Sequence, residues 1–178
     1  MLSFNNLKIG QKLAAGFGIV IVLLLVIGIT GYSGISRLEK DVLDIGDNRI
    51  PTLLALATLN YERMVIRAQT LEVFWYEDTA DSQADYQRIL EERATSWKNV
   101  ETAYSTLLQI ERTDEQGRNL LVKLEKEYQA WRQIYVTLDN LVNQLSRTNN
   151  SAKKAELYEK YMEAVQAMIP ISNTFGAT

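Results

Sequence analysis

Two arginines four residues apart, Arg63 and Arg67, are the side chains in this sequence best suited to bind a ligand. They lie in a stretch with a helical pattern, and residues three or four apart share one face of a helix, so both guanidinium groups project together. A guanidinium binds a carboxylate through two parallel hydrogen bonds, and two guanidinium groups side by side form an anion clamp. Asn60 and Thr70 occupy neighbouring positions of the same face. These four residues are therefore candidates for binding a small carboxylate.

This face, which we call the arginine seam, is polar only in its middle. It runs through Leu53, Leu56, Asn60, Arg63, Arg67, Thr70 and Phe74. If another helix covers the seam, the guanidinium groups need an anion, because a buried unpaired charge is costly. A solvated surface is the alternative explanation, since Glu62 and Glu72 lie nearby and mixed charges are usually exposed to water. Both interpretations remain open at this point.

Two tyrosines near the start of the last predicted helix, Tyr158 and Tyr161, are further candidates for the ligand site. Tyrosines at such positions are most often core residues whose hydroxyl group finds a partner. In an up-down bundle, however, the fourth helix begins at the end of the bundle where the first helix finishes. We therefore expect Tyr158 and Tyr161 to meet Arg63 and Arg67.

The composition argues against catalysis, metal binding and nucleic-acid binding. The 178 residues contain neither histidine nor cysteine, so the commonest general base, the thiol nucleophile and the usual transition-metal ligands are missing. The sequence has no glycine-rich phosphate loop and no metal-ligand spacing. The net charge of −3 provides no basic surface for phosphate groups. We expect a protein that is not an enzyme, has no catalytic residues, metal or cofactor, and does not bind nucleic acid.

Heptad spacing of apolar residues predicts that residues 37–178 form an all-α, antiparallel up-down four-helix bundle. The expected helices are 37–78, 82–112, 115–147 and 151–176, separated by short polar breaks. The heptad positions of the first helix, which we call the heptad seam, are Ile50, Leu54, Ala57, Tyr61, Met64, Ala68, Leu71 and Trp75. The corresponding positions of the other helices are Tyr86, Leu90, Ala94, Trp97, Tyr104 and Leu108; Leu121, Leu124, Tyr128, Trp131, Tyr135, Leu138, Val142 and Leu145; and Leu157, Tyr161, Ala164, Met168, Ile171 and Phe175.

Local signals suggest where the helices begin. Thr113 or Asp114 is expected to cap the third helix, and Asn150 or Ser151 the fourth, because their side chains can accept hydrogen bonds from the first turn. Pro51 either begins a new helix or kinks a continuous one, and the sequence is compatible with both.

An uncharged, largely apolar run from Leu13 to Ser36 is long enough to cross a membrane as one helix. About 20 helical residues span the roughly 30 Å hydrocarbon core. Lys8 and Lys12 precede the run, whereas charges of mixed sign follow it, so the positive-inside rule places the N-terminus in the cytoplasm. A cleaved signal peptide is the alternative, but its apolar core is normally shorter and is followed by a site of small residues.

The expected organisation is therefore a cytoplasmic tail (1–12), a transmembrane helix (13–36) in the bacterial inner membrane and a periplasmic bundle (37–178). After four antiparallel helices the chain returns to the membrane face. We expect it to end there just before a second transmembrane helix.

The residues Asn6-Leu7-Lys8-Ile9-Gly10-Gln11-Lys12-Leu13, with Gly16-Phe17 and the apolar run after them, resemble the opening of bacterial methyl-accepting chemotaxis proteins. Asp47-Asn48-Arg49-Ile50-Pro51 resembles the Asn-Arg-x-Pro element in the first helix of their four-helix-bundle sensor domains. The remaining helices match these chemoreceptors in pattern. The resemblance implies that the chain is a chemoreceptor's membrane helix and ligand-binding domain.

The resemblance also implies a homodimer whose ligand binds near the interface between the first helices, so that the arginine seam is the dimer face. Ligand binding would move the fourth helix and the second transmembrane helix along the membrane normal, and a HAMP domain and a cytoplasmic coiled coil would pass the signal to a histidine kinase and its adaptor. Arg63 and Arg67 fall roughly where aspartate-type receptors carry ligand arginines. Thr70 follows them where that family has a third arginine, so we expect a small carboxylate that is an organic or aromatic acid as readily as an amino acid.

Two other functions compete with a chemoreceptor. Membrane histidine kinases and diguanylate cyclases use the same sensor module, and the output domain that distinguishes them follows the sensor. A membrane-tethered structural bundle without any ligand is the second alternative, and it predicts that no small molecule stabilises the domain.

Overall fold

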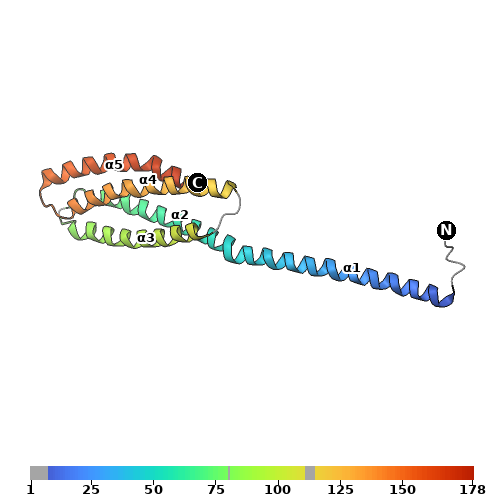
Figure 1. The fold of residues 1–178 in the computed structure, drawn as a ribbon. Helices are drawn as coiled ribbons and strands as arrows, with labels where there is room; N and C mark the ends of the chain where they lie inside the picture. The colour runs from blue at the N-terminus through green and yellow to red at the C-terminus, as the bar shows by residue number, and fades with distance from the viewer. Residues whose placement is uncertain (1–7, 80, 111–114) are drawn as a thin grey trace. The chain divides into compact units, whose positions relative to one another are not determined.

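The computed structural model describes residues 8–79, 81–110 and 115–178, and this part of the chain is helical apart from short turns (Figure 1). Its elements are α1 (Ile9–Asp44), the π-helix η2 (Ile45–Arg49), α2 (Ile50–Glu72), the 3₁₀-helix η3 (Val73–Tyr76), α3 (Gln83–Gln109), α4 (Glu115–Leu145) and α5 (Ser151–Ala177). The predicted all-α fold, with a long apolar helix before four bundle helices, is confirmed.

The first helix, α1, is largely apolar, and most of its side chains are exposed in this structure. None of its residues is buried, and its most apolar 18-residue window has a mean hydropathy of 2.8. Among the described residues it is the one segment long and apolar enough to cross a membrane. It begins at Ile9, four residues before the expected start, while residues 1–7 of the expected tail lie outside the described part of the chain. A helix that is apolar all round needs an apolar surrounding, and a lipid bilayer provides one.

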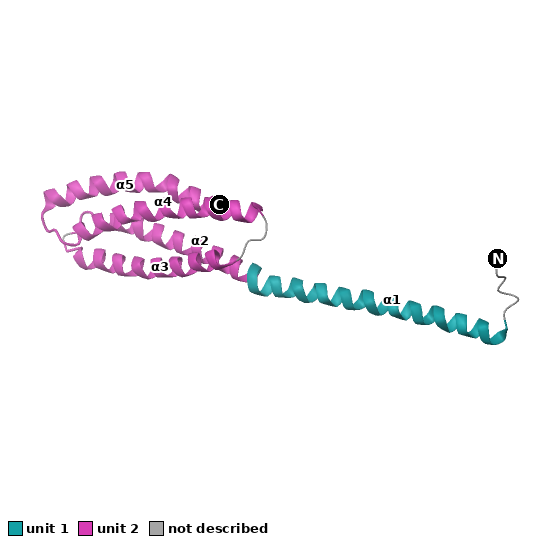
Figure 2. Ribbon diagram, viewed as in Figure 1, with its two compact units in different colours: residues 1–49 teal, residues 50–178 magenta. Residues whose placement is uncertain are grey.

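The chain divides into two compact units, residues 1–49 and 50–178 (Figure 2). The boundary lies next to Pro51, yet the backbone stays helical from Ile9 to Tyr76. Proline has no N–H to donate to the carbonyl group four residues earlier, here that of Asp47, and its ring crowds that carbonyl. Asp47 lies within the π-helix η2, and such a local widening accommodates a disrupted hydrogen bond. Pro51 therefore perturbs a continuous helical segment and does not begin a separate one.

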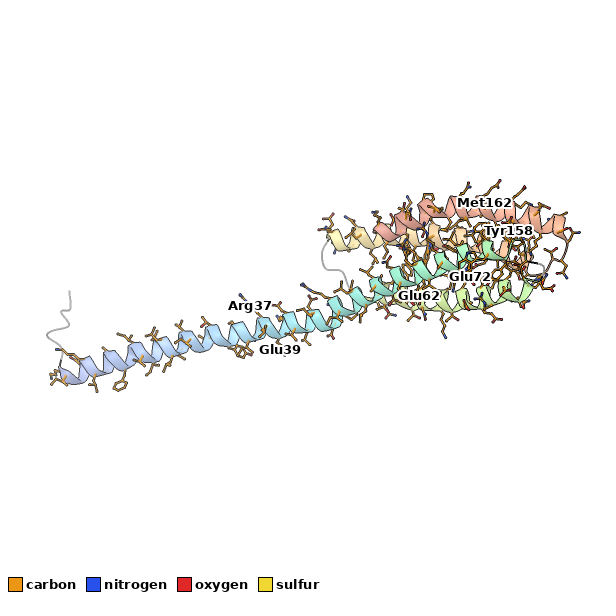
Figure 3. The ribbon with its side chains drawn as sticks, turned by 180° about the vertical axis from the view of Figure 1, so that it is seen from behind. Arg37, Glu39, Glu62, Glu72, Tyr158 and Met162 are labelled. Atoms are coloured by element: carbon orange, nitrogen blue, oxygen red, sulfur yellow. The ribbon has the colours of Figure 1, made fainter. Side chains whose placement is uncertain are left out.

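Residues 50–178 form an antiparallel bundle in which each helix lies beside the next and α5 lies beside α2 (Figure 1). The closest packing joins α2 to α3 and α4 to α5. Tyr158, near the start of α5, lies where α2 ends (Figure 3). Phe175, near the end of α5, lines the same cavity as Leu56 from the first turns of α2. This is the up-down arrangement that the short turns predicted.

The predicted caps have different outcomes. Asn150 caps α5 as expected, because its side chain accepts a hydrogen bond from the backbone N–H of Lys153 at 2.9 Å. The predicted caps Thr113 and Asp114, and the expected end of the second bundle helix at residue 112, lie outside the described residues.

Aromatic side chains fill the middle of the bundle. Trp131 of α4 stacks on Phe175 of α5 with ring centres 4.8 Å apart, and it also contacts Trp97 of α3 at 4.7 Å. Tyr104 and Tyr128 stack at 4.0 Å. Packed aromatic pairs add about 0.5–1.5 kcal/mol each beyond the area that they bury. These contacts connect α3, α4 and α5 into one core.

The heptad pattern predicts the buried face of α4 and α5. Seven of the eight heptad positions of α4 are buried, and those of α5 are either buried or packed against the core. In α3 the pattern misses two positions, since Ala94 and Leu108 are exposed and the neighbouring Arg93 and Leu107 are buried. For α3 to α5, one apolar stripe per helix is enough to identify the side that faces the core.

In α2 the heptad seam faces away from the bundle. Its exposed side chains include Leu54, Tyr61 and Trp75, which are 63%, 66% and 78% exposed. The buried face of α2 instead contains Ala55, Leu59, Glu62, Ile66, Gln69 and Thr70, and it continues into η3 with Val73. Heptad spacing therefore predicts the helix but not its buried side, because α2 carries one apolar face toward the bundle and a second that none of the described residues covers.

Candidate ligand-binding site

Arg63 is half-buried and is held against α5. Its Nε and Nη2 atoms donate to Oδ1 of Asn60 at 3.3 and 2.8 Å, and its Nη1 donates to the backbone carbonyl oxygen of Ser172 at 3.0 Å. The guanidinium group lies directly over Gly176, where a Cβ atom would overlap it. Asn60 thus orients Arg63 from its own helix, and the missing side chain of Gly176 lets Arg63 reach the backbone of α5.

Arg67, one turn further along α2, makes a similar contact with α5. Its Nη1 donates to Oδ1 of Asn173 at 3.0 Å. Among the described residues, no carboxylate forms an ion pair with Arg63 or Arg67, whereas Arg88 and Arg93 each have a carboxylate partner at 2.5 Å. Partial burial and the positive charge of Arg67 lower the pKa of Arg63. The two arginines are therefore an adjacent cationic pair with neutral partners only.

The arginine seam lies along α5 and is only partly exposed. Toward the C-terminal end of α2, Thr70 is fully buried, and its hydroxyl group donates to the backbone carbonyl oxygen of Ile66 at 2.7 Å. Phe74 packs on the rings of Tyr158 and Tyr161 at 6.4 and 5.4 Å. The part of the seam near Asn60 is exposed. The seam is thus partly a contact between α2 and α5 and partly exposed, and the expectation that it is the dimer face stays a prediction.

The structure does not bring Tyr158 and Tyr161 to the arginines. Tyr161 donates to the carbonyl oxygen of Thr70 at 2.9 Å, and Tyr158 donates to that of Val73 at 3.0 Å and lies 2.6 Å from the hydroxyl oxygen of Tyr86. Both tyrosines are almost completely buried at the last turn of α2. The contact of Arg63 on α5 is eleven residues beyond Tyr161, or about 16 Å along a helix. The tyrosines therefore lie at the predicted end of the bundle, where α2 ends. Arg63 and Arg67 lie one to three helical turns before that end.

Raising the pH above 10 is expected to destabilise the bundle through these tyrosines. Burial raises the pKa of Tyr161 to about 12, although the nearby charge of Arg93 opposes the shift. Between the ordinary tyrosine pKa of about 10 and pH 12, the unfolded chain loses this proton while the folded chain keeps it. The stabilising contribution is thus complete below pH 10 and decreases above it by about 1.4 kcal/mol per pH unit. Urea unfolding at pH 8, 10 and 11 would measure the decrease.

Tyr161→Phe is the matched control for this pH dependence, because it removes the titrating group and keeps the ring. Its unfolding free energy should decrease less steeply between pH 10 and 11 than that of the parent chain. Equal slopes for the two proteins would show that Tyr161 does not titrate differently in the folded and unfolded states.

Sequence reasoning missed a buried arginine in α3. Arg93 is fully buried, and its Nη1 lies 2.5 Å from Oδ1 of Asp139 on α4. Burial by itself lowers the pKa of Arg93, but Tyr161 and Asp139 raise it above its ordinary value. The signal that could have identified this residue is its register, since Arg93 is four residues after the buried Ile89.

A comparison with protein families identifies this arrangement. Residues 6–173 match the family model described as a four-helix-bundle sensory module for signal transduction. The match covers the N-terminal helix and nearly all of the bundle, and it supports the resemblance to chemoreceptor sensor domains seen in the sequence. No curated protein and no solved structure matches the chain significantly.

Proposed function

The chain belongs to the family of four-helix-bundle sensory modules for signal transduction, and we propose that it is the sensor region of a bacterial transmembrane chemoreceptor. In this proposal α1 crosses the inner membrane and the bundle lies in the periplasm. The bundle binds a small carboxylate, and α5 passes the signal toward the cytoplasmic module that controls a histidine kinase. A sensor with a kinase or cyclase output would use the same ligand site, so a test of the site does not depend on the output.

The observation that carries the ligand proposal is the cationic pair Arg63 and Arg67. Two like charges one helical turn apart repel each other, and the lowered pKa of Arg63 reflects this repulsion after the effect of burial. A bound carboxylate would remove the repulsion and accept charge-assisted hydrogen bonds, which are about twice as strong as neutral ones. Because the neutral partners Ser172 and Asn173 both belong to α5, an anion at the pair would also change how α2 holds α5.

We further propose that two copies of the chain associate through the heptad seam of α2. The seam repeats at steps of four and three, which is the spacing of a two-helix coiled-coil interface. Most of its large side chains are exposed in the single chain, and a contiguous exposed apolar stripe marks an interaction surface. Because α1 would anchor both copies in one membrane, the two α2 helices would be parallel, with their seams in register. The arginine seams would then flank this interface.

The ligand proposal predicts that Arg63→Ala weakens carboxylate binding by about 10- to 100-fold and that Arg67→Ala, which removes nearby positive charge, weakens it less. A hydrogen bond to a charged group contributes about 1.5–3 kcal/mol, and about 1.4 kcal/mol corresponds to a factor of ten in Kd. The measurement is calorimetric titration of the full chain in lipid nanodiscs with a panel of organic and amino acids. Arg147→Ala, at an exposed position in the α4–α5 turn, is the matched control and should bind like the parent chain.

Two results would contradict the ligand proposal. If a carboxylate binds equally well to the parent chain and to both variants, the site lies elsewhere. If no acid in the panel binds or raises the melting temperature, the structural-bundle alternative is favoured, because a ligand that binds the folded state must stabilise it.

A further inference from the structure

Two adjoining cavities open beside Arg63 at the end of the bundle where α2 begins and α5 ends. The smaller cavity, of about 210 Å³, is lined by Leu56, Leu59, Asn60, Arg63, Leu124, Phe175, Gly176 and Thr178. The larger cavity, of about 290 Å³, is lined by Thr52, Leu56, Leu107, Gly117, Leu120, Leu121, Leu124 and Thr178. Leu56, Leu124 and Thr178 line both, so the two spaces are neighbours.

The polar and apolar groups of these cavities are arranged asymmetrically. Among the described residues of the two linings, Arg63 is the one charged side chain, and Asn60 beside it is the one side-chain amide. Three of the five N–H groups of Arg63 are donated to Asn60 and Ser172, which leaves two for a ligand. Away from Arg63 the walls are mainly leucine and phenylalanine side chains. A ligand here would meet a cation at one end and an apolar surface along its body.

This asymmetry decides between classes of carboxylate. Among the described residues neither lining contains aspartate or glutamate, and the nearby Glu127 is already bound by the Thr178 hydroxyl group and by Lys123, so the ammonium group of an amino acid would find no free carboxylate partner. The second carboxylate of a dicarboxylic acid would have to lie among leucines, and burying an unpaired charge is strongly unfavourable. Arg67 does not reach either lining, so it contributes positive potential but no second binding group. An acid with a single charge and an apolar body fits all of these conditions.

We propose that the ligand of this sensor is a hydrophobic monocarboxylate, such as an aromatic acid, whose carboxylate binds Arg63 and whose apolar body enters the cavities at Leu56 and Leu124. The size is suitable, since an apolar cavity of about 150 Å³ accommodates a benzene ring. The smaller cavity therefore holds one ring beside Arg63, and the larger cavity admits a longer body. This inference rests on the proposed function and narrows its ligand from carboxylates in general to one class.

The test is calorimetric titration of the full chain in nanodiscs with four probes, using empty nanodiscs as the blank for partition into lipid. Benzoate has the charge and the apolar body, benzamide has the body alone, and succinate and aspartate carry a second charge. Benzoate is expected to bind at least ten times more tightly than each of the other three. Arg63→Gln is expected to abolish this difference between benzoate and benzamide.

Leu124→Trp tests the cavity, because the larger side chain fills the space that both cavities share. It should weaken benzoate binding at least tenfold. If Leu124→Trp lowers the melting temperature strongly, Leu120→Trp is used in its place, because Leu120 is half-exposed and lines the larger cavity. Leu120→Trp should weaken the binding of the longer 4-phenylbutyrate. Val136→Trp, at an exposed position of the same helix outside both linings, is the matched control and should leave binding unchanged.

The outcomes separate this inference from the function on which it rests. If succinate or aspartate binds in a manner that depends on Arg63 while benzoate does not, the hydrophobic class is wrong and the carboxylate sensor stands. If benzoate binds and the cavity-filling variants bind it as well as Val136→Trp does, the location is wrong. If none of the charged probes binds, both the inference and the proposed carboxylate site are contradicted.

Discussion

Asp139→Ala is expected to destabilise the bundle by about 3–5 kcal/mol, because it leaves Arg93 as a buried cation without a carboxylate. The Arg93 side chain is 1% exposed, and Asp139 is its one ion-pair partner among the described residues. Its Nε and Nη2 atoms have no hydrogen-bond partner in the described structure, and the nearby Tyr161 and the ring of Tyr135 do not carry a formal negative charge at neutral pH that could replace the carboxylate. The free energy of unfolding, from urea titration of the full chain followed by circular dichroism, measures the effect.

Two controls separate burial from charge in this experiment. Glu156→Ala breaks ion pairs of similar length with Lys153 and Lys160 on the surface of α5, and it should have a far smaller effect because water solvates the lysines. The double variant Arg93→Met, Asp139→Leu removes both charges and should recover most of the lost stability. An Asp139→Ala protein as stable as the Glu156→Ala protein would show that Arg93 reaches water in the folded state.

Arg93 also shows why part of the fold could not be predicted from the sequence. The periodicity of apolar residues finds a buried stripe only where the buried residues are apolar, so it chose Ala94 in place of Arg93. In α4 and α5 each helix has a single apolar stripe, and there the pattern located the core correctly. A cation in a core register becomes recognisable only when its partner, Asp139 on another helix, is known.

The arginine pair shows the corresponding limit for the site. Spacing on one helix was enough to place Arg63 and Arg67 on a common face, because that geometry is local. Their acceptors Ser172 and Asn173 are more than a hundred residues away in the chain, so the spacing could not reveal them. Up-down topology placed Tyr158 at the correct end of the bundle, but it does not fix which turn of α2 faces which turn of α5. The local part of the site was therefore predictable, and its pairing across helices was not.

For the same reason, the buried face of α2 was the feature most difficult to predict from the sequence. An apolar stripe is equally apolar whether it packs within one chain or between two chains, so periodicity cannot assign it. In α2 the exposed heptad seam is apolar throughout, whereas the buried residues keep the same spacing of four and three but include the polar Glu62 and Gln69. A helix whose outer stripe is more uniformly apolar than its inner one has the pattern expected of a subunit interface.

Met64→Glu is expected to abolish association through this stripe without unfolding the bundle. Met64 lies in the middle of the heptad seam and is 50% exposed, so the single chain tolerates a charge there. In a parallel two-fold pair the two introduced carboxylates would face each other, and like charges at an interface cost several kcal/mol. We expect the dissociation constant to rise by at least about 100-fold, which corresponds to about 2.7 kcal/mol.

Because the chain contains no cysteine, a single introduced thiol reports on this interface directly. Ala57→Cys, on the heptad seam, should form a disulfide-linked dimer when the chain in membranes is oxidised, since a disulfide requires Cβ atoms about 3.5–4.5 Å apart. Val136→Cys, exposed on α4 away from the seam, should stay monomeric and serves as the control. Adding Met64→Glu to Ala57→Cys should prevent the cross-link while the melting temperature stays close to that of the parent chain. Efficient cross-linking at Val136, or cross-linking at Ala57 that survives Met64→Glu, would mean that the heptad seam of α2 is not the surface that joins two copies.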